Sequence, residues 1–314
     1  MKKSVFTVML ALLSLQAMSQ ESQTAYNFLR LPVSAHVAAL GGENITLAED
    51  DASLIFHNPA LIQNVTDRTL NLNMMTYMQG TVTASASFVK AWGERATWGV
   101  SGRYMDYGEM KEMNNQGTQL GTFGARDVAL AGTLSYGLTE HISGGITAKM
   151  AASYMGNYNS LAALVDIGLN YWDANGEWSL SAVAKNLGGQ LDAFEDDFER
   201  MPLDLQVGIS KRLLNSPLRL SLTLVRLNDW EYNFGKHLVV GADLLLGTQF
   251  YIGAGYNALR ASEMKISNGS EESVHGAGLS IGGGIQLERL KLHVAYGKYH
   301  VSASSLLINV SYAL

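Results

Sequence analysis

Few residues in this chain stand at a spacing that could do chemistry. His300 and Ser302 would share one face of an extended strand, and Asn309 follows in the next segment. A histidine that removes the hydroxyl proton turns such a serine into a nucleophile. Ser302 stands among other serines and His300 lies at a predicted loop, so we expect a structural role for both. The chain has no His-Glu-x-x-His zinc motif, no Gly-Lys-Ser/Thr phosphate loop and no cysteine. We therefore expect no enzymatic activity, no metal site and no cofactor.

An acidic cluster follows one predicted strand, where residues 194–199 read Phe-Glu-Asp-Asp-Phe-Glu. Calcium loops usually alternate their ligands around a glycine turn, and this segment does not. A solvated loop is the simplest interpretation. A partner surface is the functional alternative, because exposed phenylalanines anchor a partner and acids steer it. A second predicted loop carries adaptable methionines. The candidate partner-binding residues are Met110, Met113, Phe194, Asp196, Asp197 and Phe198.

The composition limits the class of protein. Hydrophobic residues make up 47% of the 314 positions and charged residues 16%, and the mean hydropathy is +0.04. Soluble domains carry about 25% charge. The chain therefore lacks the charge of an ordinary soluble surface, yet it is not apolar enough for a bundle of membrane helices. A net charge of −6 predicts no nucleic-acid partner.

The first residues have the pattern of a secretory signal peptide. Lys2 and Lys3 precede a mostly apolar run over 5–15, and Ala17-Met18-Ser19 resembles a cleavage site. The run is shorter than the about 20 residues that a spanning helix needs. We predict a signal peptide at 1–19 and a mature chain beyond an inner membrane.

Apolar and polar residues alternate along much of the remaining chain, which indicates strands with two unlike faces. The alternation predicts about fourteen strands between 67 and 314, each long enough to cross a membrane at a tilt. Long odd-numbered connections are expected at 107–123, 188–201 and 259–274, and short turns between them. Outer-membrane barrels sort their loops in this way. The sequence thus predicts an all-β fold, a closed transmembrane antiparallel β-barrel in the cell outer membrane with periplasmic termini and extracellular long loops.

Charged residues fall on the polar parity of these strands and should face the lumen. Charges at membrane depth persist where they face an interior and pair with one another. We interpret them as a paired lumen network, not as catalysts or a conduction path. These residues are Arg103, Asp127, Lys149, Asp166, Lys185, Asp204 and Asp243.

Residues 20–66 do not fit the strand pattern, and we predict that they form a plug inside the barrel. The segment mixes short apolar runs with turn and capping residues, and its apolar content argues against a flexible tail. The plug residues singled out by these signals are Gly41, Gly42, Asp50, Asp51, Asn58 and Pro59.

This segment resembles the start of FadL-like outer-membrane proteins. The similar stretches are Ala-x-x-Gly-Gly at 38–42, Ala-Glu-Asp-Asp-Ala-Ser at 48–53 and Asn-Pro-Ala-Leu at 58–61. Residues 26–35 are similar to the opening of the PorV/PorQ family of the type IX secretion system. That resemblance implies a non-catalytic anchor of a cell-surface attachment complex. The implied partners are a PorZ-like surface protein, PorU, PorV, outer-membrane lipid and lipopolysaccharide.

Two main functions therefore remain open. The chain is either such an anchor or a FadL-type transporter of hydrophobic molecules with a plug that rearranges. A transporter needs an apolar pocket at the plug with a route to lipid, whereas an anchor needs a sealed lumen and a sizeable outer interface. A passive porin is a lesser alternative, because the predicted plug counts against it.

Overall fold

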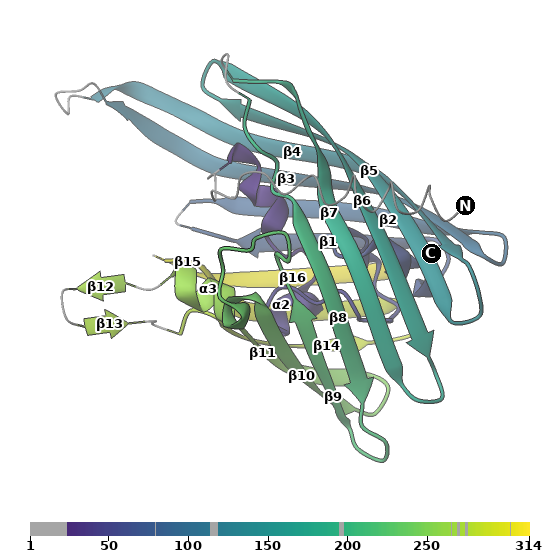
Figure 1. Ribbon diagram of the computed structural model, residues 1–314. Coiled ribbons are helices and arrows are strands. Elements are labelled where there is room, and N and C mark those ends of the chain that lie inside the picture. The colour runs from purple at the N-terminus through teal and green to yellow at the C-terminus, as the bar shows by residue number, and fades with distance from the viewer. Residues whose placement is uncertain are drawn as a thin grey trace, which may run out of the picture.

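Fourteen antiparallel strands close into a single barrel in the computed structural model (Figure 1). The structure describes residues 24–78, 80–113, 119–194, 198–264, 266–268, 271–273, 276–301 and 303–314, so the expected signal peptide lies outside it. The prediction of about fourteen strands between 67 and 314 in one closed barrel is confirmed. The barrel strands are β1 (Thr69–Thr76), β2 (Val82–Trp92), β3 (Ala96–Met113), β4 (Gln119–Gly137), β5 (Ile142–Met155), β6 (Tyr158–Asp173), β7 (Trp178–Asp192), β8 (Asp204–Arg212), β9 (Leu218–Leu224), β10 (Leu238–Leu246), β11 (Phe250–Asn257), β14 (Leu279–Gln286), β15 (Leu290–His300) and β16 (Ala303–Ala313).

Closure comes from β1, which pairs with β2 on one side and with β16 on the other. The alternation of the sequence becomes a division between the two faces of the wall. In β1, Leu72 is 53% exposed on the outer face, while Asn71 and Asn73 point inward and are buried. The Asn73 amide donates to Asn71 Oδ1 at 2.6 Å and to Ser85 Oγ at 3.1 Å. Polar side chains thus satisfy one another inside, and apolar side chains cover the outside.

The two ends of the barrel differ in their connections. One end, which we call the short-turn end, carries the start of β1, the end of β16 and six short connections. These connections are β2–β3, β4–β5, β6–β7, β8–β9, β10–β11 and β14–β15. The opposite, long-loop end carries the β7–β8 and β9–β10 connections and the β11–β14 connection. That last connection contains α3 (Ala258–Glu263) and a separate hairpin of β12 (Ile266–Asn268) and β13 (Glu271–Ser273). The β9–β10 connection includes η4 (Phe234–His237), and its length is not among the sequence-based predictions.

The predicted loop at 107–123 is wrong, because β3 and β4 continue through most of it. Their register shifts between Asp106 and Glu109, where Gly108 has a φ of 74°, and pairing resumes with Glu109 opposite Gly124. The bulge interrupts the period-two pattern, so the pattern alone ends the strands too early. Figure 1 shows this hairpin reaching beyond the neighbouring strands.

Residues 24–66, which we call the inner segment, lie inside the barrel (Figure 1). The segment has four short helices, and none of the helices in the described part of the chain is long and apolar enough to cross a membrane. Leu40, Ile45, Leu54 and Leu61 are at most 1% exposed. The helices are η1 (Ala25–Arg30), α2 (Ala35–Ala39), η2 (Ala52–Phe56) and η3 (Pro59–Asn64).

Glycines in the barrel wall admit the inner segment at close range. A Cβ on Gly255 would lie 2.6 Å from the carbonyl oxygen of Leu40, and one on Gly145 would lie 2.6 Å from the amide nitrogen of Ala60. Both distances are far below van der Waals contact. We call these positions glycine sockets; the others whose Cβ would meet the inner segment below 3.0 Å are Gly99, Gly168, Gly208, Gly241 and Gly282. The wall and the inner segment are therefore fitted to each other at backbone level.

Candidate functional site

The two predicted plug glycines end α2 and turn the chain along the barrel wall. Gly41 and Gly42 have φ values of 102° and 91°, which residues with a side chain rarely adopt. The Gly42 amide donates to Val37 O at 2.9 Å, and Asn257 Nδ2 donates to Gly41 O at 3.2 Å. The turn is thus tied both to its own helix and to the end of β11.

The remaining predicted plug residues cap helices or join the inner segment to the wall. Asp51 caps η2 and also accepts a hydrogen bond from Ser34 Oγ at 3.1 Å. Asn58 caps η3, with Pro59 at the first helical position, and donates to Ile45 O at 3.0 Å. These contacts hold distant parts of the inner segment together.

Asp50 lies at the short-turn end and forms a 2.5 Å ion pair with Lys291 of β15. Burial raises the pKa of the Asp50 carboxyl, but hydrogen bonds from Lys291 and Thr66 outweigh it and lower the pKa. The Thr66 amide donates to Asp50 Oδ1 at 2.7 Å. This carboxylate fastens the inner segment next to the start of β1.

A four-membered ion network fixes α2 to the barrel wall. His36 contacts Glu49 through Nδ1 and Asp243 through Nε2, each at 3.0 Å. Arg219 contacts the same two carboxylates, each at 2.5 Å. Two cations and two anions close a ring between the inner segment and strands β9 and β10, and the His36 ring stacks on Tyr251 at 3.7 Å.

The network keeps His36 protonated at neutral pH. Burial lowers the pKa of His36, but the charges and hydrogen bonds of Glu49 and Asp243 outweigh it and raise the pKa to about 9. Burial likewise opposes the ionised form of Glu49, while Arg219 and His36 hold its pKa well below the usual range. Each charge therefore has two opposite neighbours, the condition under which buried ions are tolerated.

The surroundings of His57 shift its pKa in the opposite direction from that of His36. Its burial, together with the positive charges of Lys185 and Arg103, holds the pKa of His57 well below its usual range. The neutral ring accepts hydrogen bonds at Nε2 from the amides of Ser34 at 3.2 Å and Val33 at 3.4 Å. His57 therefore acts as a neutral tie within the inner segment.

Charges on the inward parity of the strands have partners, as the sequence predicts. Lys149 pairs with Asp166 at 2.8 Å, and Lys185 pairs with Glu43 of the inner segment at 3.3 Å. Arg103 instead donates to two backbone carbonyls of the inner segment, Phe28 O at 2.5 Å and Leu31 O at 2.8 Å. The inner segment supplies partners that a strand pattern cannot reveal.

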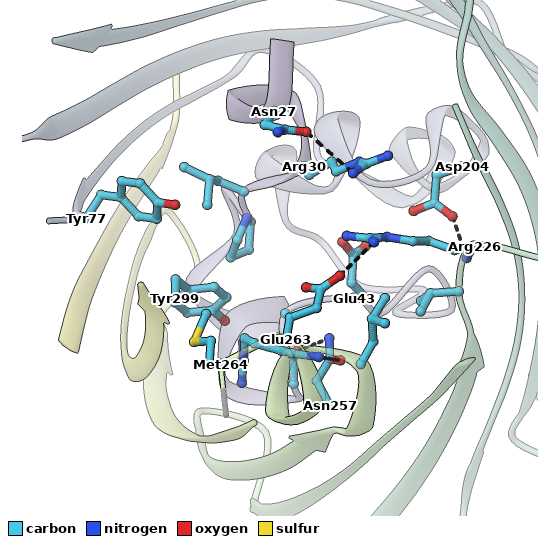
Figure 2. Close-up of a pocket in the computed structure, with 17 residues that line it drawn as sticks. Asn27, Arg30, Glu43, Tyr77, Asp204, Arg226, Asn257, Glu263, Met264 and Tyr299 are labelled. Carbon is cyan, nitrogen blue, oxygen red and sulfur yellow. Dashed lines mark hydrogen bonds and ion pairs between the residues drawn. The ribbon is translucent and has the colours of Figure 1, made fainter. Parts of the chain in front are cut away.

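A polar cavity of about 570 Å³, which we call the vestibule, lies beside the inner segment at the long-loop end (Figure 2). The ion pair of Arg226 and Glu263 reaches across it at 2.8 Å. Arg226 belongs to the β9–β10 connection and Glu263 ends α3. The lining residues are Asn27, Arg30, Leu31, Pro32, Gly41, Gly42, Glu43, Tyr77, Asp204, Val225, Arg226, Asn257, Leu259, Arg260, Glu263, Met264 and Tyr299.

A second cavity, of about 300 Å³, lies next to η1 and carries four methionines, so we call it the methionine pocket. Met105 is buried in its wall, and Phe28 packs against Met105 in the same apolar cluster. About half of the lining residues also carry a polar group; among them, Asp127 accepts hydrogen bonds from Tyr107 and Ser153, each at 2.5 Å. The other lining residues are Thr24, Ala25, Asn27, Leu31, Tyr77, Met78, Met110, Ala125, Met155 and His300.

The described candidate partner-binding residues lie in a strand and beside the end of β7. Met110 lies in β3 and lines the methionine pocket, and Met113 ends the same strand. Phe194 is half-buried and Phe198 is 66% exposed, while Asp196 and Asp197 lie outside the described residues. The neighbouring Glu199 accepts a hydrogen bond from the amide of Ala25 at 2.7 Å. The acidic cluster thus contributes to holding η1.

Two large aromatic side chains on the long-loop end escaped the sequence analysis. Trp230 is 78% exposed and Phe234 is 65% exposed, both in the β9–β10 connection. The signal that could have found them is their position in an odd-numbered connection between two short strands.

The residues weighed for catalysis do not assemble. Ser302 lies outside the described residues, His300 pairs with Ala303, and Asn309 stands opposite His293, about six residues further along β16. A Gly-Leu-Ser-Ile-Gly sequence at 278–282 also matches the spacing of a hydrolase nucleophile. Its serine lies in β14 and accepts a hydrogen bond from Arg260 Nη2 at 3.0 Å, and arginine cannot serve as a base.

Comparisons with known proteins identify the fold. No family model and no curated protein matches the chain. Among solved structures, the chain is similar to the CymD monoaromatic hydrocarbon channel, with a TM-score of 0.61 and 14% identity over 90% of this chain and 97% of that one. It is also similar to the Pseudomonas putida toluene transporter TodX, with a TM-score of 0.57 and 12% identity over 90% and 97%. The chain therefore has the fold of FadL-like barrels.

Proposed function

We propose that this chain is an outer-membrane barrel that takes up small hydrophobic molecules, as a FadL-type transporter does. The observation that carries the proposal is the methionine pocket, a cavity at the inner segment that is lined by four methionines and is close to the long-loop end. Methionine and aromatic side chains adapt to apolar ligands of different shape. The names of the structural neighbours, a monoaromatic hydrocarbon channel and a toluene transporter, support an apolar cargo.

The proposed orientation follows from the two ends of the barrel. The apolar outer face meets lipid, the short-turn end faces the periplasm, and the long-loop end faces the exterior. The methionine pocket then collects ligand from outside. The inner segment acts as the plug and blocks a straight path through the bore, so transport requires part of it to move.

A binding experiment tests the proposal. Purified protein in lipid nanodiscs is equilibrated with radiolabelled toluene, and binding to empty nanodiscs is subtracted. Met110→Trp fills the pocket, so we expect at least about a tenfold loss of affinity, the effect of about 1.4 kcal/mol. Met74→Trp is the matched control, because Met74 is 50% exposed on the outer wall. Equal toluene binding by both variants would contradict the proposal.

A surface anchor is the second candidate, in which the barrel holds a PorZ-like protein near PorU and PorV. Two observations favour it: the ion network and the glycine sockets hold the inner segment tightly in the bore, and Trp230 and Phe234 are exposed on the long-loop end. Affinity purification from solubilised membranes separates the candidates. Co-purification of large surface proteins, lost on Trp230→Ser with Phe234→Ser, supports the anchor. Recovery of the barrel alone with a bound apolar molecule supports the transporter.

A further inference from the structure

The vestibule and the methionine pocket share a wall. Asn27, Leu31 and Tyr77 line both cavities, and each of these side chains is half-buried. Arg103 fixes part of this wall, because it donates to the carbonyl of Leu31. An elongated ligand that passes Leu31 would therefore meet an apolar chamber on one side and a charged chamber on the other.

The vestibule balances its charges. The lining contains as many guanidinium groups as carboxyl groups, in the two sets Arg30, Arg226, Arg260 and Glu43, Asp204, Glu263. A ligand with a single charge gains no net attraction from such a lining and loses hydration on entry. A ligand that carries both signs can match the lining at two points.

The ion pair of Arg226 and Glu263 makes this match specific. It joins the β9–β10 connection to α3 across the cavity (Figure 2). An isolated carboxylate that binds Arg226 would leave Glu263 next to a second negative charge. A zwitterion can enter between the two side chains, of which Arg226 is 15% and Glu263 36% exposed, and provide each with an opposite charge, so neither ion loses its partner.

We propose that the ligand is a single-chain amphiphile with a zwitterionic head group. Its apolar chain lies in the methionine pocket, and its head group lies in the vestibule between Arg226 and Glu263. The inference rests on the proposed function and deepens it by naming the ligand class. It excludes a preference for fatty-acid carboxylates at this site.

Ligands that share the same short alkyl chain and differ in their head group test the inference. Hexylphosphocholine, hexanoate, hexyltrimethylammonium and hexanol are titrated by calorimetry against the protein in maltoside micelles, with empty micelles subtracted. We expect hexylphosphocholine to bind at least about tenfold more tightly than hexanoate or hexyltrimethylammonium. Equal or tighter binding of hexanoate would overturn the inference.

Charge variants locate the head group. Glu263→Gln should weaken hexylphosphocholine about tenfold and strengthen hexanoate, and Arg226→Gln should strengthen hexyltrimethylammonium. Glu177→Gln is the matched control, because Glu177 pairs with Arg212 at the short-turn end, away from both cavities. Heat-modified gel mobility verifies that each variant is folded. Unchanged head-group preference in folded Glu263→Gln would overturn the inference.

The outcomes separate the two proposals. Tight hexanol and toluene binding without a preference for the zwitterion retains the transporter and refutes the head-group assignment. No binding of hexanol or toluene to the parent protein refutes the transporter itself. Hexylphosphocholine binding that Met110→Trp leaves unchanged refutes the placement of the chain in the methionine pocket.

Discussion

Removal of Arg219 should release the inner segment locally from the barrel wall. In Arg219→Met, the carboxylates of Glu49 and Asp243 keep only His36 as a shared cation. Arg219 is 12% exposed, so water replaces the lost charge poorly. Breaking a buried pair by removing one partner costs about 3–5 kcal/mol. This cost falls on the attachment of α2, because His36 belongs to that helix.

Hydrogen exchange with mass spectrometry measures this effect on the folded protein. If α2 opens locally, a cost of about 3–5 kcal/mol corresponds to roughly a hundred- to several-thousand-fold faster exchange of its amides. Arg212→Met is the control, because the Arg212 side chain is 44% exposed, and surface pairs contribute about 0–1 kcal/mol. Unchanged exchange in α2 of the Arg219 variant would refute the view that the ion network holds the inner segment.

Three further predictions concern the same attachment. Gly255→Ala places a methyl group against the backbone that follows α2 and should lower the folded fraction on heat-modified gels, whereas Gly189→Ala meets no atom within 4 Å and should fold normally. The pKa of His36 is about 9 in the fold against 6.5 in a free side chain, so its stabilisation is complete below pH 6.5 and is lost as the pH rises through 9. Protection factors of α2 should therefore fall between pH 7 and pH 10, and His36→Gln should remove this dependence. Lys291→Met should cost only about 1 kcal/mol in urea unfolding at neutral pH, because the Asp50 carboxyl that it unpairs is 34% exposed and is reached by water, and this cost should shrink as acid protonates that carboxyl.

The strand pattern could be predicted from the sequence because each wall residue faces either lipid or the interior. Leu70 and Leu72 point outward while Asn71 points inward, so a period of two survives along the strand. The pattern failed where this division ends. Around Gly108 the hairpin rises beyond its neighbours (Figure 1), and a bulge changes the parity.

The site was less accessible to sequence reasoning, because its partners come from the path of the inner segment. Asp243 stands on the inward parity, which predicts a partner but not that His36 and Arg219 provide it. Glycines such as Gly145 resemble bends in a sequence, and their role emerges only when Ala60 is found against them. Residues of η1 line both cavities, and this helix of six residues is too short to show a helical pattern of apolar residues in the sequence.

The glycine sockets impose an order on assembly. The inner segment meets the wall backbone to backbone at Gly145 and Gly255 and through side chains at the other sockets, and it leads directly into β1. β1 also forms the seam with β16, so the first and last strands must meet to complete the cylinder. A folded inner segment fitted this closely cannot be threaded into a finished cylinder. We therefore expect the seam between β1 and β16 to close only after residues 24–66 have packed against the other strands.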